Sequence, residues 1–110
     1  MSGQTTMLQQ IEELLIAPTS GSAAPSLAHV EDTLTEGYAR ALALEAERWR
    51  LERRLGEVAR TVDGPDSAGF ADELSSLAKR LTSADGELSH LRSLLGSLHD
   101  RARALRLAGA

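Results

Sequence analysis

The tetrapeptide ELSH, Glu87 to His90, has the residue types and spacing that could hold a metal ion. On a helix, residues three apart lie on one face, so the Glu87 carboxylate and the His90 imidazole can bind the same ion. Such a centre needs further carboxylates, and the sequence has no second copy of the pattern. Glu47 is the candidate for a third ligand, and two chains of a dimer would each supply one set. A metal site would therefore use Glu87, His90 and Glu47.

The pattern is similar to the Glu-x-x-His of ferritin-like di-iron bundles, in which helices supply both ligands to the bundle core. The similarity covers this tetrapeptide and the size of a small two-helix subunit, and it implies a metal-binding helical bundle as an alternative function. In the helical register derived below, His90 projects from the outer flank. We therefore expect a solvated Glu87 and His90, with no cofactor.

Other chemistry is not favoured by the sequence. No nucleophile, base and orienting group occur at a recognisable spacing, so we expect neither a catalytic residue nor a small-molecule substrate. The arginines between Arg48 and Arg60 could contact nucleic acid, but Glu47, Glu52 and Glu57 interrupt them, and the net charge of the chain is −4. A nucleic-acid-associated coiled coil is the second alternative.

The composition is typical of long helices. Apolar residues make up 42% of the chain and aromatic residues 3%, with leucine and alanine dominant. No apolar stretch approaches the roughly 20 residues that cross a bilayer, and the N-terminus does not resemble a signal peptide. Cysteine is absent. We expect a cytoplasmic protein that does not bind membranes.

Residues 1–17 predict a short amphipathic helix, and residues 18–25 a flexible linker. Thr6 and Gln9 have the spacing of a capping box, and Pro18 cannot continue the helix. The apolar face of this helix consists of Met7, Leu8, Ile11, Leu14 and Leu15. Gly21 and two prolines mark the linker.

Residues 26–107 predict an antiparallel helical hairpin. Its helices span about residues 26–62 and 68–107, joined by a turn at residues 63–67. Ser26 is a plausible N-cap, and Asp63-Gly64-Pro65 ends the first helix. The predicted fold is therefore all-α: a long coiled-coil-like two-helix hairpin with a short N-terminal helix.

The register of the hairpin follows from its apolar spacing. Apolar residues recur at alternating steps of three and four from position 27 to 62 and from 70 to 105, which is the spacing of a coiled-coil seam. The two series are mirror images, so that paired positions always sum to 132. Small residues then lie opposite large ones, with Gly37 opposite Leu95 and Ala84 opposite Arg48.

Charges beside the seam agree with this register. The expected ion pairs are Arg54 with Glu73, Glu47 with Arg80, and Arg40 with Glu87, and a further one joins His99 to Glu31. A different side-chain geometry would bring Glu47 near Glu87. Such pairs specify register more than stability, since each contributes about 0–1 kcal/mol.

Tyr38, Leu42 and Trp49 form an apolar stripe turned away from the seam, and such stripes mark contact surfaces. Three molecules or segments are candidates to cover this stripe. They are the N-terminal helix through Ile11, Leu14 and Leu15, a second copy of the chain, or a helix of another protein. The N-terminal helix could also be a docking peptide carried by the hairpin.

We accordingly expect a non-catalytic scaffold, adaptor or regulatory subunit, whose contact residues are Tyr38, Leu42 and Trp49. Its partners would be a second copy of itself, in a homodimer or four-helix bundle, or another helical protein.

Overall fold

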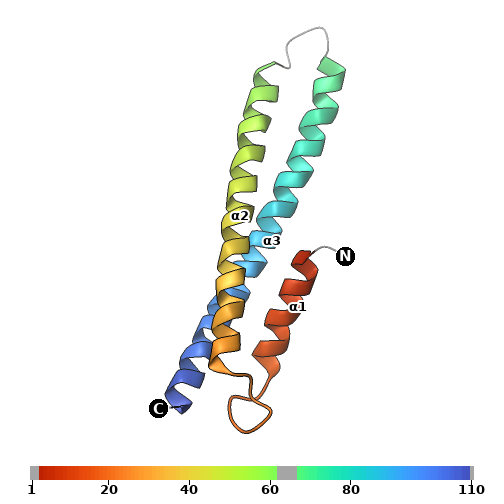
Figure 1. Ribbon diagram of the computed structural model, residues 1–110. Helices are drawn as coiled ribbons and strands as arrows, with labels where there is room; N and C mark the ends of the chain where they lie inside the picture. The colour runs from red at the N-terminus through yellow and green to blue at the C-terminus, as the bar shows by residue number, and fades with distance from the viewer. Residues whose placement is uncertain (1–2, 62–66, 110) are drawn as a thin grey trace. The chain divides into compact units, whose positions relative to one another are not determined.

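The computed structural model describes residues 3–61 and 67–109 (Figure 1). The helices are α1 (Gly3–Ile16), α2 (Leu27–Arg60) and α3 (Ser67–Ala108), and the described residues contain no strand. The predicted all-α class is confirmed. The chain divides into two compact units, one of Met1–Ala41 with His90–Ala110 and the other of Leu42–Ser89. We call them the three-helix unit and the two-helix unit.

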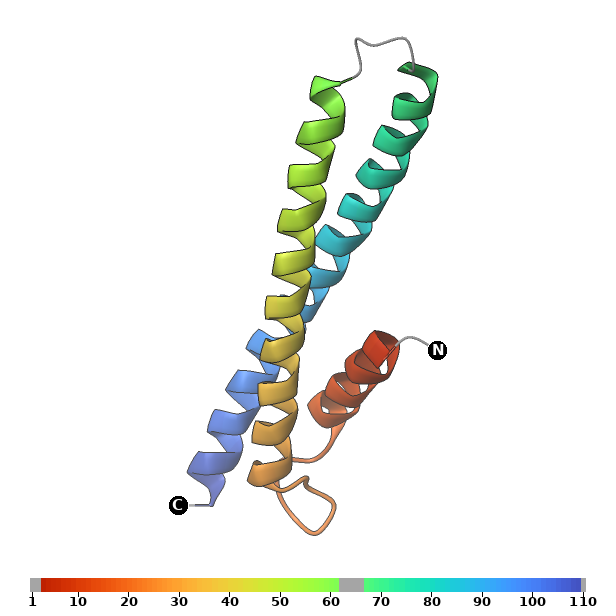
Figure 2. The ribbon, with the colours of Figure 1, turned by 45° about the horizontal axis from the view of Figure 1, so that its top comes forward.

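The three-helix unit combines α1 with the first part of α2 and the last part of α3. Figures 1 and 2 show that α1 runs opposite to this part of α2, and therefore in the direction of α3. Its buried side chains come from all three helices. They are Ile11, Leu14, Val30, Thr33, Leu34, Ala41, Leu91, Leu95, Leu98 and Ala102. The N-terminal helix is thus part of a shared core.

The two-helix unit is built from the rest of α2 and the first part of α3. Its core contains Leu51, Val58, Leu77 and Ala84, with Leu55, Phe70, Leu74 and Leu81 packed against them. These residues all belong to the two apolar series of the sequence. Each pair of facing residues in the seam takes one residue from each helix. The core of this unit is therefore a single row of such pairs.

Contacts within each unit confirm the predicted register. In the three-helix unit, a Cβ atom placed on Gly37 would collide with the Leu95 side chain. In the two-helix unit, Arg54 Nη2 lies 2.7 Å from the Glu73 carboxylate. The first pair belongs to the mirror-image series, and the second is one of the ion pairs expected beside it.

Other side chains depart from the predicted pairing. Glu31 accepts a hydrogen bond from Arg106 at 3.1 Å, while His99 Nδ1 lies 3.9 Å from Asp100, so the pairing of His99 with Glu31 is wrong. The longer arginine side chain, with several donors, reaches across the helix pair more easily than the histidine. Arg48 extends past the small Ala84 to Asp85, at 3.2 Å.

One further expected ion pair is absent from the described contacts. The structure gives no ion pair between Glu47 and Arg80 among the described residues, although both line one surface depression. Arg40 belongs to the three-helix unit and Glu87 to the two-helix unit.

The helix ends follow local signals, with one exception. The His29 amide donates to Ser26 Oγ at 3.1 Å, which confirms Ser26 as the N-cap of α2. The capping box at Thr6 is wrong, because α1 begins at Gly3 and Thr6 lies inside it. No proline stands before Thr6, so nothing stops the helix from extending toward the N-terminus.

The ends of the other segments differ little from the prediction. α1 ends at Ile16, and residues 17–26 contain no helix, with Gly21 in the left-handed region at φ 85°. α2 ends at Arg60 rather than near residue 62, and α3 continues to Ala108. The predicted turn, residues 63–67, lies outside the described residues except for Ser67, where α3 begins.

Candidate functional site

The two-helix unit exposes two large apolar side chains on α2, Leu42 and Trp49. Their exposed fractions are 66% and 57%. Residues seven apart on a helix lie two turns apart on nearly one face, so the two side chains share one side of α2. Tyr38, which belongs to the three-helix unit, is 46% exposed. All three predicted contact residues therefore lie at the surface.

Leu42 and Trp49 are exposed because the seam is already filled by other residues. The inward positions of α2 in this unit are held by Leu44, Leu51 and Val58, each at most 5% exposed. The Arg53 guanidinium stacks over the Trp49 ring, 4.7 Å from its centroid. A cation over an indole face is attracted by the ring quadrupole, and this contact orients Trp49 at the surface.

The predicted contact residues of α1 are buried within the three-helix unit. Ile11 is fully buried, Leu14 is 7% exposed and Leu15 is half-buried. Tyr38 of the same unit nevertheless stays half exposed. Of the three predicted occupants of the apolar stripe, α1 is therefore not the one that covers Tyr38.

α1 lies instead on a flank of the α2–α3 pair. Glu12 Oε1 of α1 lies 3.9 Å from His90 Nε2 of α3. Thr33 of α2 stands beside the seam rather than in it, yet it is only 4% exposed, and Leu94 of α3 is half-buried. α1 is the only other helix of this unit that can cover them. We call Thr33, Leu94 and His90, with the seam between them, the α1 groove.

The sequence carries a signal for this groove that the apolar spacing does not show. Stepping by sevens along the flank from Thr33 and Leu94 gives five charged residues in the two-helix unit, and Thr61 is the neutral exception. The charged residues are Glu47, Arg54, Glu73, Arg80 and Glu87. In the three-helix unit Arg40 and Arg101 continue the charged series, and Thr33 and Leu94 are the neutral positions beside them. A further helix can pack at these two positions, because burying unpaired charges is costly.

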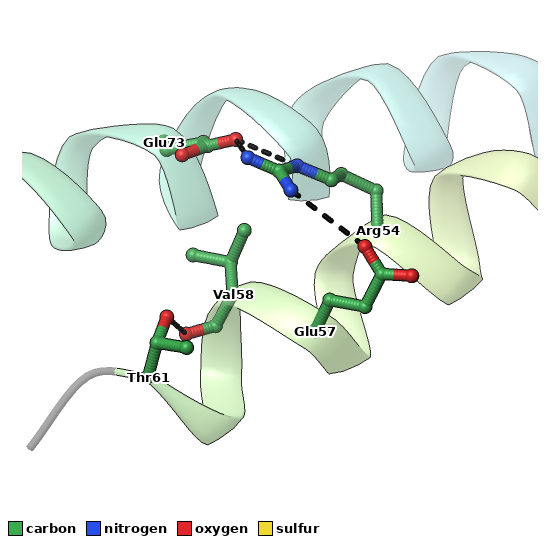
Figure 3. Close-up of polar contacts among 5 residues, drawn as sticks. All are labelled: Arg54, Glu57, Val58, Thr61 and Glu73. Atoms are coloured by element: carbon green, nitrogen blue, oxygen red, sulfur yellow. Dashed lines mark hydrogen bonds and ion pairs between the residues drawn. The ribbon is translucent and has the colours of Figure 1, made fainter.

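The corresponding flank of the two-helix unit is organised by ion pairs (Figure 3). Arg54 donates from Nε to Glu73 at 2.9 Å, and its Nη1 lies 3.6 Å from Glu57. The hydrogen bond to Glu73 and the negative charge of Glu73 raise the pKa of Arg54, with a smaller contribution from Glu57. This flank is suited to water and to charged ligands rather than to an apolar helix.

The candidate metal ligands are distributed over both units. Glu47 and Glu87 line a shallow depression of the two-helix unit together with Lys79 and Arg80. The two basic side chains oppose the approach of a cation. His90 belongs to the three-helix unit, where it contacts Glu12. Over residues 3–61 and 67–109, no three His, Asp or Glu side chains are placed to hold a metal ion.

Comparison with known proteins adds no identification. No family model, curated protein or solved structure matches the chain. None of the described helices is both long and apolar enough to cross a membrane.

Proposed function

We propose that the chain is a non-catalytic helical subunit that binds a second copy of itself through the outer side of α2, and another helical protein is the alternative partner for the same surface. The observation that carries this proposal is the exposure of Leu42 and Trp49, which lie on one side of a helix whose inward positions are already filled.

Burial of these side chains would supply a driving force for association. Removing a leucine or an aromatic side chain from water contributes about 1.5–3 kcal/mol. Tryptophan is also enriched among the residues that dominate binding energy at interfaces. Two helices with one seam leave most of their surface in water, and two copies packed side by side would form a four-helix bundle. The cytoplasm is the proposed location, in accord with a sequence that has no cysteine.

Sedimentation velocity over a range of concentrations tests this proposal. We expect the wild-type chain to form a dimer, and Trp49→Ala and Leu42→Ala each to raise its dissociation constant at least tenfold. Leu107→Ala is the matched control, because Leu107 is an apolar residue on α3 that is even more exposed, at 75%. Helix content should stay unchanged in all three variants.

Two results would contradict the proposal. A wild-type chain that stays monomeric at every concentration would exclude self-association. A loss of helix content in Trp49→Ala would show that the ring supports the fold of the two-helix unit rather than a contact with another molecule.

A further inference from the structure

The contact between α1 and the rest of the three-helix unit is confined to one face of a short helix. Among the described side chains of α1, Ile11 and Leu14 are buried and Met7, Leu8 and Leu15 are half-buried, while Ile16 is 85% exposed. The one described ion pair to the groove is Glu12 with His90, at 3.9 Å, between side chains that are each more than half exposed. Exposed pairs at this distance hold two elements together only weakly.

α1 also has little reason to be helical without the groove. Its 14 residues fall at the length where an isolated helix is marginal in water, so packing of the Ile11 face supplies most of its order. It joins α2 through residues 17–26, which contain no helix. α1 is thus a short helix on a connection long enough to let it leave the groove.

The groove itself keeps its shape from other contacts. Its floor is the seam of α2 and α3, in which Val30, Leu95 and Leu98 are at most 2% exposed. Thr33 donates its hydroxyl to the His29 carbonyl at 3.0 Å, so this buried polar group needs no partner from α1. Withdrawal of α1 would therefore uncover an apolar groove without leaving a buried Thr33 hydroxyl unpaired.

We propose that the α1 groove is a second binding site, and that α1 is its tethered, displaceable occupant. The partner it fits is an amphipathic helix with α1's pattern: apolar side chains three apart at the places of Ile11 and Leu14, and a carboxylate between them opposite His90. Such a helix, supplied by another molecule, displaces α1 and binds between α2 and α3. This site is separate from the Leu42 and Trp49 surface and does not depend on self-association.

A fluorescein-labelled peptide of residues 3–17 is the probe, and fluorescence anisotropy with full-length protein is the measurement. In the wild-type chain, tethered α1 competes at an effective concentration of about millimolar. Ile11→Asp expels α1 because a buried carboxylate cannot replace the isoleucine. We expect the peptide to bind this variant at least tenfold more tightly than wild type. Ile16→Asp, on the exposed side of α1, should bind it as weakly as wild type.

A second test cross-links α1 to α3, and it does not depend on a variant from which α1 has been expelled. The sequence has no cysteine, so Glu12→Cys with His90→Cys gives two unique thiols at the edge of the groove. Bridging them with a short bis-maleimide should reduce peptide binding at least tenfold relative to the same variant capped with N-ethylmaleimide. The Trp49→Ala chain should bind the peptide as wild type does.

Either of two results would overturn the proposal. One is equal binding to wild type and to Ile11→Asp, measured while circular dichroism shows that the variant keeps α2 and α3. The other is equal binding to the bridged and the capped chain. Both leave the proposed contact through Leu42 and Trp49 untouched, because that contact is measured by sedimentation.

Discussion

Gly37 of α2 faces Leu95 of α3 so closely that the leucine side chain fills the space where a Cβ atom at position 37 would stand. Leu95 is itself 2% exposed. The close approach explains a glycine inside a helix, where it otherwise costs about 1 kcal/mol relative to alanine. Packing of the three-helix unit thus depends on the absence of a side chain.

Gly37→Ala should therefore destabilise the protein although it raises helix propensity. Overpacking a filled core costs about 1–3 kcal/mol, which exceeds the gain in propensity. Urea unfolding followed by circular dichroism measures the difference. Gly86→Ala and Gly96→Ala are the controls, because a Cβ at either position meets no atom within 4 Å. They should stabilise by up to about 1 kcal/mol, and a stabilised Gly37→Ala would refute the packing described.

Exchanging the charges of Arg54 and Glu73 should test the register of the two-helix unit. Arg54→Glu alone places two carboxylates together and should lower the urea midpoint, whereas Arg54→Glu with Glu73→Arg should restore most of it. The difference in urea midpoint between the single and the double exchange should shrink in 1 M salt, where the Debye length is about 3 Å. If the double exchange is no better than the single one, the two side chains do not interact in solution.

The contribution of Arg54 to the free energy of unfolding should not vary with pH in the neutral range. A raised pKa of a basic group gives stability that is fully present below the pKa of the unfolded chain and is lost only as the pH rises through the folded value. For arginine that range lies far above neutral pH. A wild-type minus Arg54→Gln difference in urea midpoint that changed between pH 6 and pH 9 would therefore point to another group.

Loss of the N-cap of α2 should be measurable by itself. Ser26→Ala removes the acceptor of the His29 amide and should cost about 1 kcal/mol, within a range of about 0.5–2. Ser20→Ala, in the non-helical segment before α2, is the control and should change stability little. An unaffected Ser26→Ala would mean that solvent caps this amide equally well.

Much of the fold could be predicted because the seam obeys one spacing rule. Gly37 opposite Leu95 follows from steps of three and four in two mirror-image series, and Arg54 beside Glu73 follows from the charges that flank those series. The position of α1 could not be predicted in this way, because its groove is marked by two neutral residues, Thr33 and Leu94, in a mostly charged flank. The stripe of Tyr38, Leu42 and Trp49 was evident as exposed, but exposure does not name the molecule that covers it.

Trp49 gives a direct optical test of what covers that stripe, because it is the only tryptophan of the chain. Trp49 is 57% exposed and has Arg53 over one face of its ring. In the monomer, its fluorescence emission should therefore be that of a solvent-exposed indole. If a second copy packs against α2, the emission should shift to shorter wavelength and acrylamide quenching should fall as concentration rises. Leu42→Ala should move both changes to concentrations at least tenfold higher, since it weakens association without altering the indole. Emission that stays constant across the sedimentation-defined dimerisation range would place the dimer interface elsewhere on the protein.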